Sequence, residues 1–309
     1  MRKALVTGGM GFIGNHLVNH LLSSGIEVLV LDKSVHKPTY CDIQKATIIE
    51  GDVLSHELLH DCLESVDTCF HLAALSSVAI CNRDWIFSHE NNVLAFNGLL
   101  EELRRIKHPV KLVYASSAAV YGDSQHLPLS ESEHILPNST YGADKLSNEI
   151  YAEVVRKVYG IPSIGLRLFN VYGPGQLASN RYSNVITTFK EAIETEQPLT
   201  IHGDGNQIRD FIYIDDVILA FMLAAQTSID KSGVFNVCSG HSISILELAE
   251  LMMRLSMKKL PINYEPKRIG DLTHSVGNGN LAKKELSFEP SISMDEGLSR
   301  MLKENDFKH

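Results

Sequence analysis

The sequence lacks any apolar run long enough to cross a membrane, which takes roughly 18 residues or more. It has only five cysteines, an odd number, and they are scattered and form no CxxC pair. This usage disfavours a disulfide framework and indicates buried thiols in a reducing cytoplasm. Because residues 2–6 already have the pattern of a strand, we expect no signal segment.

Positive charge is also scarce, since 28 Lys and Arg face 37 Asp and Glu, for a net charge of −9. This balance argues against a general polyanion-binding surface, so we expect no nucleic acid partner. An anionic substrate would need a few local Arg or Lys residues instead. We also expect no metal site.

Short apolar runs alternate with stretches of helical period through roughly the first 170 residues. The runs include 4–6, 28–31, 47–49, 68–70 and 112–114, and the helical stretches include 16–24, 93–107 and 145–159. Buried strands separated by helices are typical of an α/β fold with a Rossmann doubly wound parallel sheet. We expect this domain over 1–170 and a second, smaller α/β domain over 171–309, with a helix and strand near 211–237 returning to the main sheet.

A glycine-rich turn follows the first predicted strand and opens a helix. Gly8, Gly11 and Gly14 allow a tight turn, close approach of a pyrophosphate and close helix–strand packing. The phosphates would lie against free N–H groups at the positive end of the helix. Asp32 ends the second apolar run, where a carboxylate can accept from both ribose hydroxyls and repels a 2′-phosphate. The pattern predicts NAD(H) rather than NADP(H) in the first domain.

Tyr141 and Lys145 are four residues apart, which places both side chains on one face of a helix. Lowering a tyrosine pKa from about 10 to about 7 requires roughly 4 kcal/mol. A lysine ammonium about 4 Å away supplies an interaction of that order at an effective dielectric near 20. Tyr141 could therefore act as a general base, with Ser117, after the run 110–115, passing a proton between it and a substrate hydroxyl. Each residue alone is more often a solvated side chain or a helix cap.

These motifs, with Asp52-Val53, His71-Leu72-Ala73-Ala74 and Asn91-Asn92-Val93, resemble the extended short-chain dehydrogenase/reductase family. The resemblance runs from about residue 3 to residue 290 and is strongest to NAD-dependent epimerases and dehydratases of the UDP-glucose 4-epimerase branch. It implies NAD as cofactor and Ser117, Tyr141 and Lys145 as the catalytic set. The implied cofactor contacts are Gly8, Gly11, Phe12, Ile13, Gly14, Asp32, Asp52, Val53, Leu72, Ala73, Ala74, Asn91, Tyr141, Lys145 and Phe169.

The resemblance also implies a UDP-sugar substrate. Its implied contacts are Ser117, Asn170, Asn184, Arg209, Arg268, Asp271 and Ser275. The two arginines would pair with the diphosphate, which suits their forked donors, although either alone could be a surface loop charge. At the position of Ser275 a tyrosine would crowd the substituent at sugar carbon 2. The small serine predicts that UDP-N-acetylglucosamine is accepted as well as UDP-glucose.

The fold supports several reactions, so the site must choose among them. Family dehydratases carry an Asp-Glu pair where this chain has Ala118 and Ala119, which cannot move a proton. Reductases commonly favour NADP, which Asp32 opposes, and no unassigned basic residue near Ser117 suggests a site for a sugar carboxylate. Epimerisation at carbon 4 through a 4-keto sugar is the favoured reaction. The alternatives are another NAD-dependent nucleotide-sugar enzyme (a UDP-glucuronate epimerase or decarboxylase, a dehydratase or a reductase) and a non-catalytic NAD-binding regulator.

Two segments, 93–103 and 146–158, carry apolar residues at helical spacing. Related enzymes pair two such helices from each subunit, so we expect a homodimer. The alternative is that both apolar stripes face the core of the chain itself.

Overall fold

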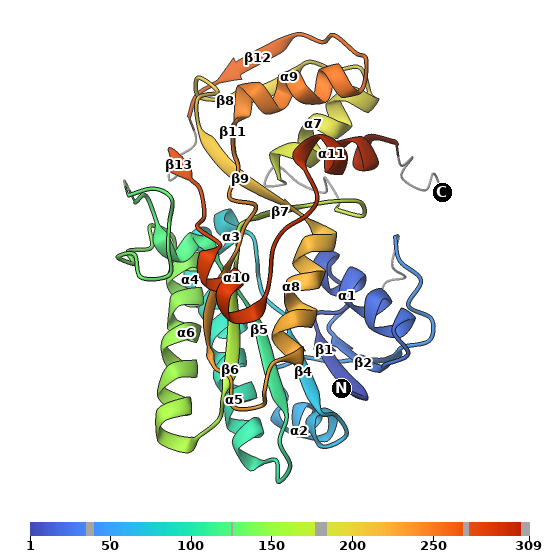
Figure 1. Cartoon of the computed structure of the whole chain (residues 1–309), viewed down its shortest axis with the longest axis vertical. Coiled ribbons are helices and arrows are strands. Elements are labelled where there is room, and N and C mark those ends of the chain that lie inside the picture. The colour runs from blue at the N-terminus through green and yellow to red at the C-terminus, as the bar shows by residue number, and fades with distance from the viewer. Residues whose placement is uncertain (35–39, 125, 177–183, 268–271, 304–309) are drawn as a thin grey trace.

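The computed structural model describes residues 1–34, 40–124, 126–176, 184–267 and 272–303, and its largest element is a seven-stranded parallel sheet. The strands run in the order β10-β6-β5-β4-β1-β2-β3. Figure 1 labels the central five, from β6 to β2. Their bounds are β1 (Lys3–Thr7), β2 (Glu27–Asp32), β3 (Thr47–Glu50), β4 (Thr68–His71), β5 (Lys111–Ser117), β6 (Ser163–Leu168) and β10 (Gly233–Val237). The sheet confirms the predicted Rossmann-type α/β fold.

Both faces of this sheet are buried. In β1, Ala4 and Val6 belong to the hydrophobic core on one face, whereas Leu5 belongs to the core on the other. All three side chains are fully buried, as the alternation of a pleated strand requires. The apolar runs in the sequence are continuous because both sets of alternate residues face packed helices.

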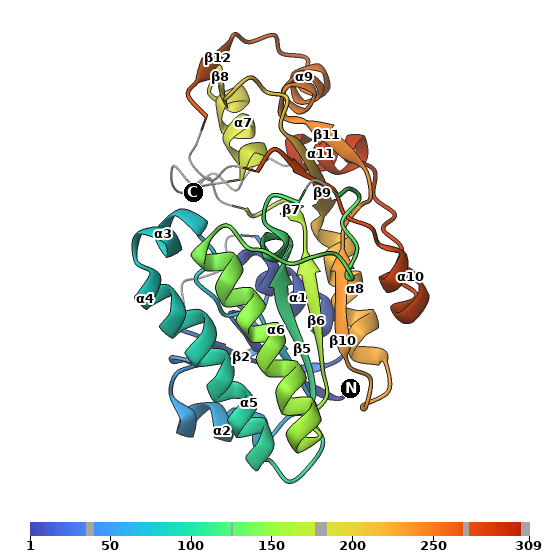
Figure 2. The ribbon, with the colours of Figure 1, turned by 90° about the vertical axis from the view of Figure 1, so that its left-hand side faces the viewer.

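Helices cover the two faces (Figure 2). On one face, α1 (Phe12–Ser23) packs against α8 (Ile214–Gln226). On the other, α5 (Ala95–Arg105) lies between α2 (His56–Glu64) and α6 (Thr140–Tyr159). The remaining short helices of this part are α3 (Val78–Arg83), α4 (Trp85–His89), the π-helix η1 (Glu90–Leu94), which runs directly into α5, and the 3₁₀ turn η2 (Ala118–Tyr121) after β5.

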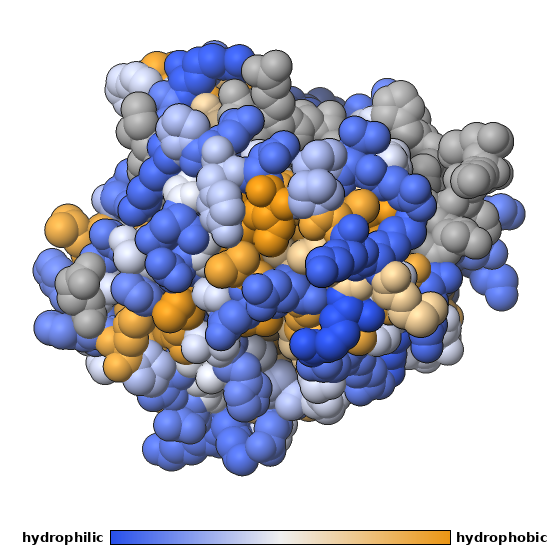
Figure 3. Space-filling model, turned by 90° about the horizontal axis from the view of Figure 1, so that it is seen from above, coloured by the Kyte–Doolittle hydropathy of each residue, from blue (hydrophilic) through white to orange (hydrophobic). Residues whose placement is uncertain are grey.

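A smaller part lies beyond the carboxyl ends of the main strands (Figure 1). In it, β8 (Leu199–His202) pairs with β12 (Ile262–Glu265), and β9 (Ile208–Tyr213) pairs with β7 (Asn170–Tyr172), β11 (Ser242–Ser244) and β13 (His274–Ser275). Its helices are α7 (Val185–Glu194), α9 (Ile245–Leu255) and α11 (Met294–Lys303), whereas α10 (Asn280–Leu286) contacts β10 of the main sheet. Seen from above, this side of the molecule is largely hydrophilic, with apolar residues in patches between polar ones (Figure 3).

The chain leaves the larger part after β6 and returns to it for α8 and β10, so the smaller part is not one continuous segment. In the main sheet, β1 lies beside β4, and the strand order proceeds outward from this pair in opposite directions. Loops diverge at such a reversal and open a crevice at the carboxyl ends of the strands, which is where doubly wound sheets bind ligands. Within the described ranges, every helix is too short or too polar to span a membrane.

Candidate active site

Two glycines where β1 passes into α1 have no room for a side chain. Gly8 has φ of +71°, and a Cβ there would lie 2.6 Å from the backbone nitrogen of Ala73. A Cβ on Gly14 would lie 2.2 Å from the carbonyl oxygen of Gly8. Gly11 is the N-cap of α1 and contributes no capping side chain, so the first N–H groups of the helix remain available to an anion.

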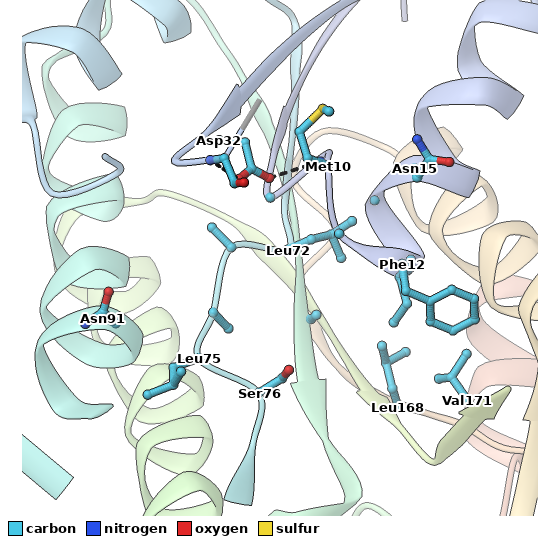
Figure 4. A pocket seen from close by; sticks show the side chains of 18 of the residues that line it. Met10, Phe12, Asn15, Asp32, Leu72, Leu75, Ser76, Asn91, Leu168 and Val171 are labelled. Atoms are coloured by element: carbon cyan, nitrogen blue, oxygen red, sulfur yellow. Dashed lines mark hydrogen bonds between the residues drawn. The ribbon is translucent and has the colours of Figure 1, made fainter. Parts of the chain in front are cut away.

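Asp32 is the last residue of β2 and lies beside the glycine turn. Its Oδ2 accepts a hydrogen bond of 3.0 Å from the backbone N–H of Met10 (Figure 4). Its Oδ1 accepts one of 3.0 Å from the backbone N–H of Ser34. These bonds fix the carboxylate beside the glycine turn. Since a carboxylate has lone pairs left after two such bonds, Asp32 can still accept from ribose hydroxyls.

A cavity of about 1010 Å³ runs along the carboxyl ends of β1, β2, β4 and β5. It is lined by the glycine turn and by nearly all of the predicted cofactor residues. These are Gly8, Gly11, Phe12, Ile13, Gly14, Asp32, Val53, Leu72, Ala73, Ala74, Asn91, Tyr141, Lys145 and Phe169, together with Ser117. The sequence reasoning did not find Lys33, Tyr40, Phe87 and Gln176, which also line it and come from separate segments with no shared motif.

Asp52 differs from the other predicted cofactor residues because it does not line this cavity. Its Oδ2 instead forms a 2.9 Å ion pair with Nζ of Lys33. The same ammonium donates a 2.8 Å hydrogen bond to Oδ1 of Asn91. Lys33 therefore joins the loop after β3 to the π-helix at the rim of the cavity.

The cavity fits a dinucleotide. The turn excludes a Cβ at Gly8 and Gly14, a helix begins at Phe12, and the Asp32 carboxylate stands at the end of the neighbouring strand. Together these features would accept a pyrophosphate and a ribose with free hydroxyls.

The predicted catalytic residues meet at the end of β5. Nζ of Lys145 donates a 2.9 Å hydrogen bond to the carbonyl oxygen of Ala115 and lies 5.8 Å from the centre of the Tyr141 ring. The Ser117 side chain hydrogen-bonds to Tyr141, and its Oγ also accepts a 3.1 Å bond from the N–H of Ala119. Helix α6 and strand β5 thus bring Ser117, Tyr141 and Lys145 to one wall of the cavity.

The expected lowering of the Tyr141 pKa is wrong for the chain by itself. Burial raises the pKa of Tyr141 to about 12, although the hydrogen bond with Ser117 acts in the opposite direction. Burial also lowers the pKa of Lys145 to about 8, against the effect of the nearby Asp144 carboxylate. The sequence-based estimate counted the attraction of the ammonium and omitted the loss of hydration that accompanies burial.

A second cavity of about 320 Å³ brings together Asn170, Asn184 and Arg209, three of the predicted substrate residues. The guanidinium of Arg209 donates 2.7 Å and 2.9 Å bonds to the carbonyl oxygens of Leu272 and Ile208. Further lining residues that the sequence reasoning missed include Thr200, His202, Gln207 and Phe211, which come from β8, β9 and the loop between them.

The remaining predicted substrate residues lie elsewhere. Ser275, 5% exposed, stands beside Arg209 in the pairing of β13 with β9, but it does not line either cavity. Arg268 and Asp271 fall outside the described residues.

The sequence expectation of no metal site overlooked residues 56–60, which read His-Glu-Leu-Leu-His, the spacing of a helical zinc motif. In the structure, Nδ1 of His56 and of His60 lie 2.8 Å and 3.1 Å from the two carboxylate oxygens of the buried Glu102. Arg105 donates to the same carboxylate at 3.1 Å. Among the described residues, no group of three or more His, Cys, Asp and Glu side chains is arranged to hold a metal ion.

Comparisons with known proteins agree with this geometry. The model of the NAD dependent epimerase/dehydratase family matches residues 4–238. The UDP-glucose 4-epimerase of Halalkalibacterium halodurans is 31% identical over 303 residues, which cover 93% of this chain and 90% of the relative.

Two solved structures are similar over nearly the whole chain. The UDP-glucose 4-epimerase of Thermotoga maritima, solved with UDP-glucose, has a TM-score of 0.92 and 32% identity and covers 97% of each chain. The UDP-N-acetylglucosamine 4-epimerase of Methanobrevibacter ruminantium, solved with UDP-N-acetylmuramic acid, has a TM-score of 0.91 and 35% identity. That match covers 98% of this chain and 97% of the other.

Proposed function

Because the chain belongs to the NAD dependent epimerase/dehydratase family, we propose that it is an NAD-dependent isomerase that inverts carbon 4 of a UDP-sugar. The reaction passes through a transient 4-keto sugar. UDP-glucose and UDP-galactose are the proposed pair, and UDP-N-acetylglucosamine is a further substrate.

The observation that carries this proposal is that neighbouring residues line the two cavities. Phe169 and Val171 line the larger one, and Asn170, the residue between them, lines the smaller one. A nucleotide diphosphate bound beside Asn170 and Arg209 would therefore end next to the wall that holds Tyr141. This is the arrangement needed for a nucleotide-sugar whose sugar reaches the cofactor.

The catalytic side chains can move the required proton. The Tyr141 phenolate takes the proton of the sugar 4-hydroxyl, directly or through the Ser117 hydroxyl, and returns it when the ketone is reduced. Lys145, through its positive charge, and Ser117, through its hydrogen bond, favour the phenolate against the effect of burial. NAD, when bound, supplies the acceptor and donor of the hydride and, in its oxidised form, a further positive charge.

The two residues that follow Ser117 favour epimerisation over dehydration. Ala118 and Ala119 begin η2, directly after the serine, and neither side chain can exchange a proton. We therefore propose that the keto sugar turns over and accepts hydride on its other face.

The experiment that tests the function is to incubate the purified protein with NAD and, separately, with UDP-glucose, UDP-N-acetylglucosamine and UDP-glucuronate. Chromatography of the products should show the 4-epimer of the accepted sugar. Tyr141→Phe should retain NAD and lose at least about 10²-fold in turnover, because it removes only the proton acceptor. If none of the UDP-sugars is converted, or if the phenylalanine variant works as well as wild type, the proposal is wrong.

The acceptance of an N-acetylated sugar rests on Ser275. A tyrosine at this position would add a phenol ring beside Arg209, in a packed region where even one methylene is felt. We therefore expect Ser275→Tyr to lower kcat/KM for UDP-N-acetylglucosamine more than for UDP-glucose. An equal effect on both sugars would show that Ser275 does not select the substituent at carbon 2.

We also propose that the enzyme is a cytoplasmic homodimer. In segment 93–103, Val93, Phe96 and Leu99 are buried in the core of the chain, and Leu94 is exposed. The side of α6 that faces away from the sheet is different. Its exposed apolar residues are Ile150, Tyr151, Val154, Val158 and Tyr159, and Trp85, Ile86 and Phe87 of the neighbouring α4 are exposed as well. An apolar surface of this kind is typical of a subunit interface.

A further inference from the structure

A buried ion pair lies behind the cavity wall that carries Ser117, Tyr141 and Lys145. Arg167 of β6 and Glu149 of α6 are 4% and 7% exposed. Two hydrogen bonds, of 2.9 Å and 2.7 Å, run from Nε and one terminal nitrogen of the guanidinium to the two carboxylate oxygens. Such forked pairing fixes the relative orientation of both groups.

The pair holds the helix that carries Tyr141 and Lys145. Glu149 follows Lys145 by four residues and Tyr141 by eight, so the three side chains lie on one face of α6. Lys145 is bonded to the carbonyl oxygen of Ala115, and the hydroxyl of Ser116 donates a 2.5 Å bond to Glu149. Two successive turns of α6 are thereby bonded to two successive residues of β5.

The same guanidinium also holds the turn that follows Ser117. The second terminal nitrogen of Arg167 donates a 2.8 Å bond to the Tyr121 hydroxyl, and the guanidinium carbon lies 4.8 Å from the centre of the Tyr121 ring. The Tyr121 hydroxyl in turn donates a 2.7 Å bond to Oδ1 of Asn236 on β10. Arg167 thus bonds both to α6, which carries Tyr141, and to η2, which begins directly after Ser117.

We propose that Arg167 and Glu149 are positioning residues, which set the register of α6 against β5 and so hold Tyr141 and Lys145 in place beside Ser117. Neither side chain lines the cavity, so they act through the residues that do. This inference rests on the proposed function, because it assigns the pair to the same catalytic set.

A merely structural role would be a weaker explanation of the pair. Buried ion pairs contribute little net stability compared with apolar side chains of similar volume, whereas they can select one arrangement of the packed elements. This pair lies where the register of α6 against β5 affects the reaction. A displacement of about 1 Å at the reacting groups can lower the rate about 10²-fold.

The test compares Arg167→Met with the double variant Arg167→Met/Glu149→Met and with Arg167→Lys. The single variant leaves a buried carboxylate without its cation and can fail to fold, whereas the double variant replaces both groups by apolar ones. Glu102→Gln is the matched control, because it alters another buried carboxylate, held by Arg105, that does not line the cavity. Each variant is measured as holoenzyme for Tm, for kcat and KM with UDP-glucose, and for the pH profile of kcat.

We expect the double variant to retain the Tm of wild type and a KM within about twofold of it. Its kcat should fall at least about tenfold, and the rising limb of its pH profile should move to higher pH. Arg167→Lys should recover part of kcat, and Glu102→Gln should keep both kcat and the profile. A double variant with the kcat and pH profile of wild type, or a control with the same loss of kcat, would overturn the assignment.

A second measurement separates this inference from the proposed function. Ionisation of Tyr141 in the holoenzyme can be followed by NMR of ring-labelled tyrosine, with Tyr141→Phe identifying the signal. If wild type converts no UDP-sugar, the proposed function fails, but the midpoint of this ionisation must still rise in the double variant. An unchanged midpoint contradicts the positioning role whatever the substrate is.

Discussion

His71 provides a test of how the buried end of β4 responds to acid. Its side chain is 3% exposed, and its Nδ1 lies 2.9 Å from Oγ1 of Thr7. Burial, together with the charge of Lys145, lowers the pKa of His71 from 6.5 to about 3. The next residues, 72–74, line the cofactor cavity, so the stability of this strand end bears directly on the site.

The sign and size of the effect follow from linkage. The unfolded chain binds a proton at this histidine below about pH 6.5, while the folded chain stays neutral until about pH 3, so stability falls with falling pH between these values. Between about pH 7.5 and about pH 5, this one group should remove about 2 kcal/mol from the free energy of unfolding. The result barely depends on the exact pKa in the folded state, because at pH 5 any value below about 4 leaves the folded histidine largely neutral.

The assay is urea denaturation of wild type and His71→Gln at both pH values, with linear extrapolation. Glutamine does not titrate, so the variant should lose about 2 kcal/mol less than wild type on acidification, whatever its stability at neutral pH. His126→Gln is the control, because it replaces a histidine whose side chain is 83% exposed. This variant should lose as much unfolding free energy on acidification as wild type does. Equal losses in wild type and His71→Gln would refute the argument.

Three further outcomes are expected. Gly14→Ala should weaken NAD binding at least about tenfold in a calorimetric titration, because its Cβ would lie 2.2 Å from the Gly8 oxygen. The control Gly279→Ala, whose Cβ has a nearest contact of 3.6 Å, should bind NAD as wild type does. Lys145→Met should lower turnover and move the pH optimum upward, since the phenolate loses its nearby cation; an unchanged pH–rate profile would contradict this electrostatic role. Light scattering at micromolar concentration should give a dimer mass for wild type and a monomer mass for Val154→Arg, which places a charge on the exposed apolar face of α6; a wild-type monomer would refute the dimer.

Local chemistry in the sequence was enough to predict the sheet and the position of the dinucleotide cavity. Gly8 and Gly14 stand where β1 passes into α1 and leave no room for a Cβ, and Asp32 ends a buried strand. Both constraints act within a few residues of the backbone. The spacing of Tyr141 and Lys145 likewise determines that they share a helix face. These features depend on the period of a helix or strand, which the sequence carries directly.

Tertiary structure decided what those side chains experience and which distant residues they meet. Asp52 pairs with Lys33 rather than lining the cavity, and burial raises the pKa of Tyr141, although the sequence placed a lysine one turn away. The pair of Arg167 with Glu149 joins residues that no short motif connects. Hydration lost on burial and contacts between separate elements depend on the packing of the whole chain, so no local pattern contains them.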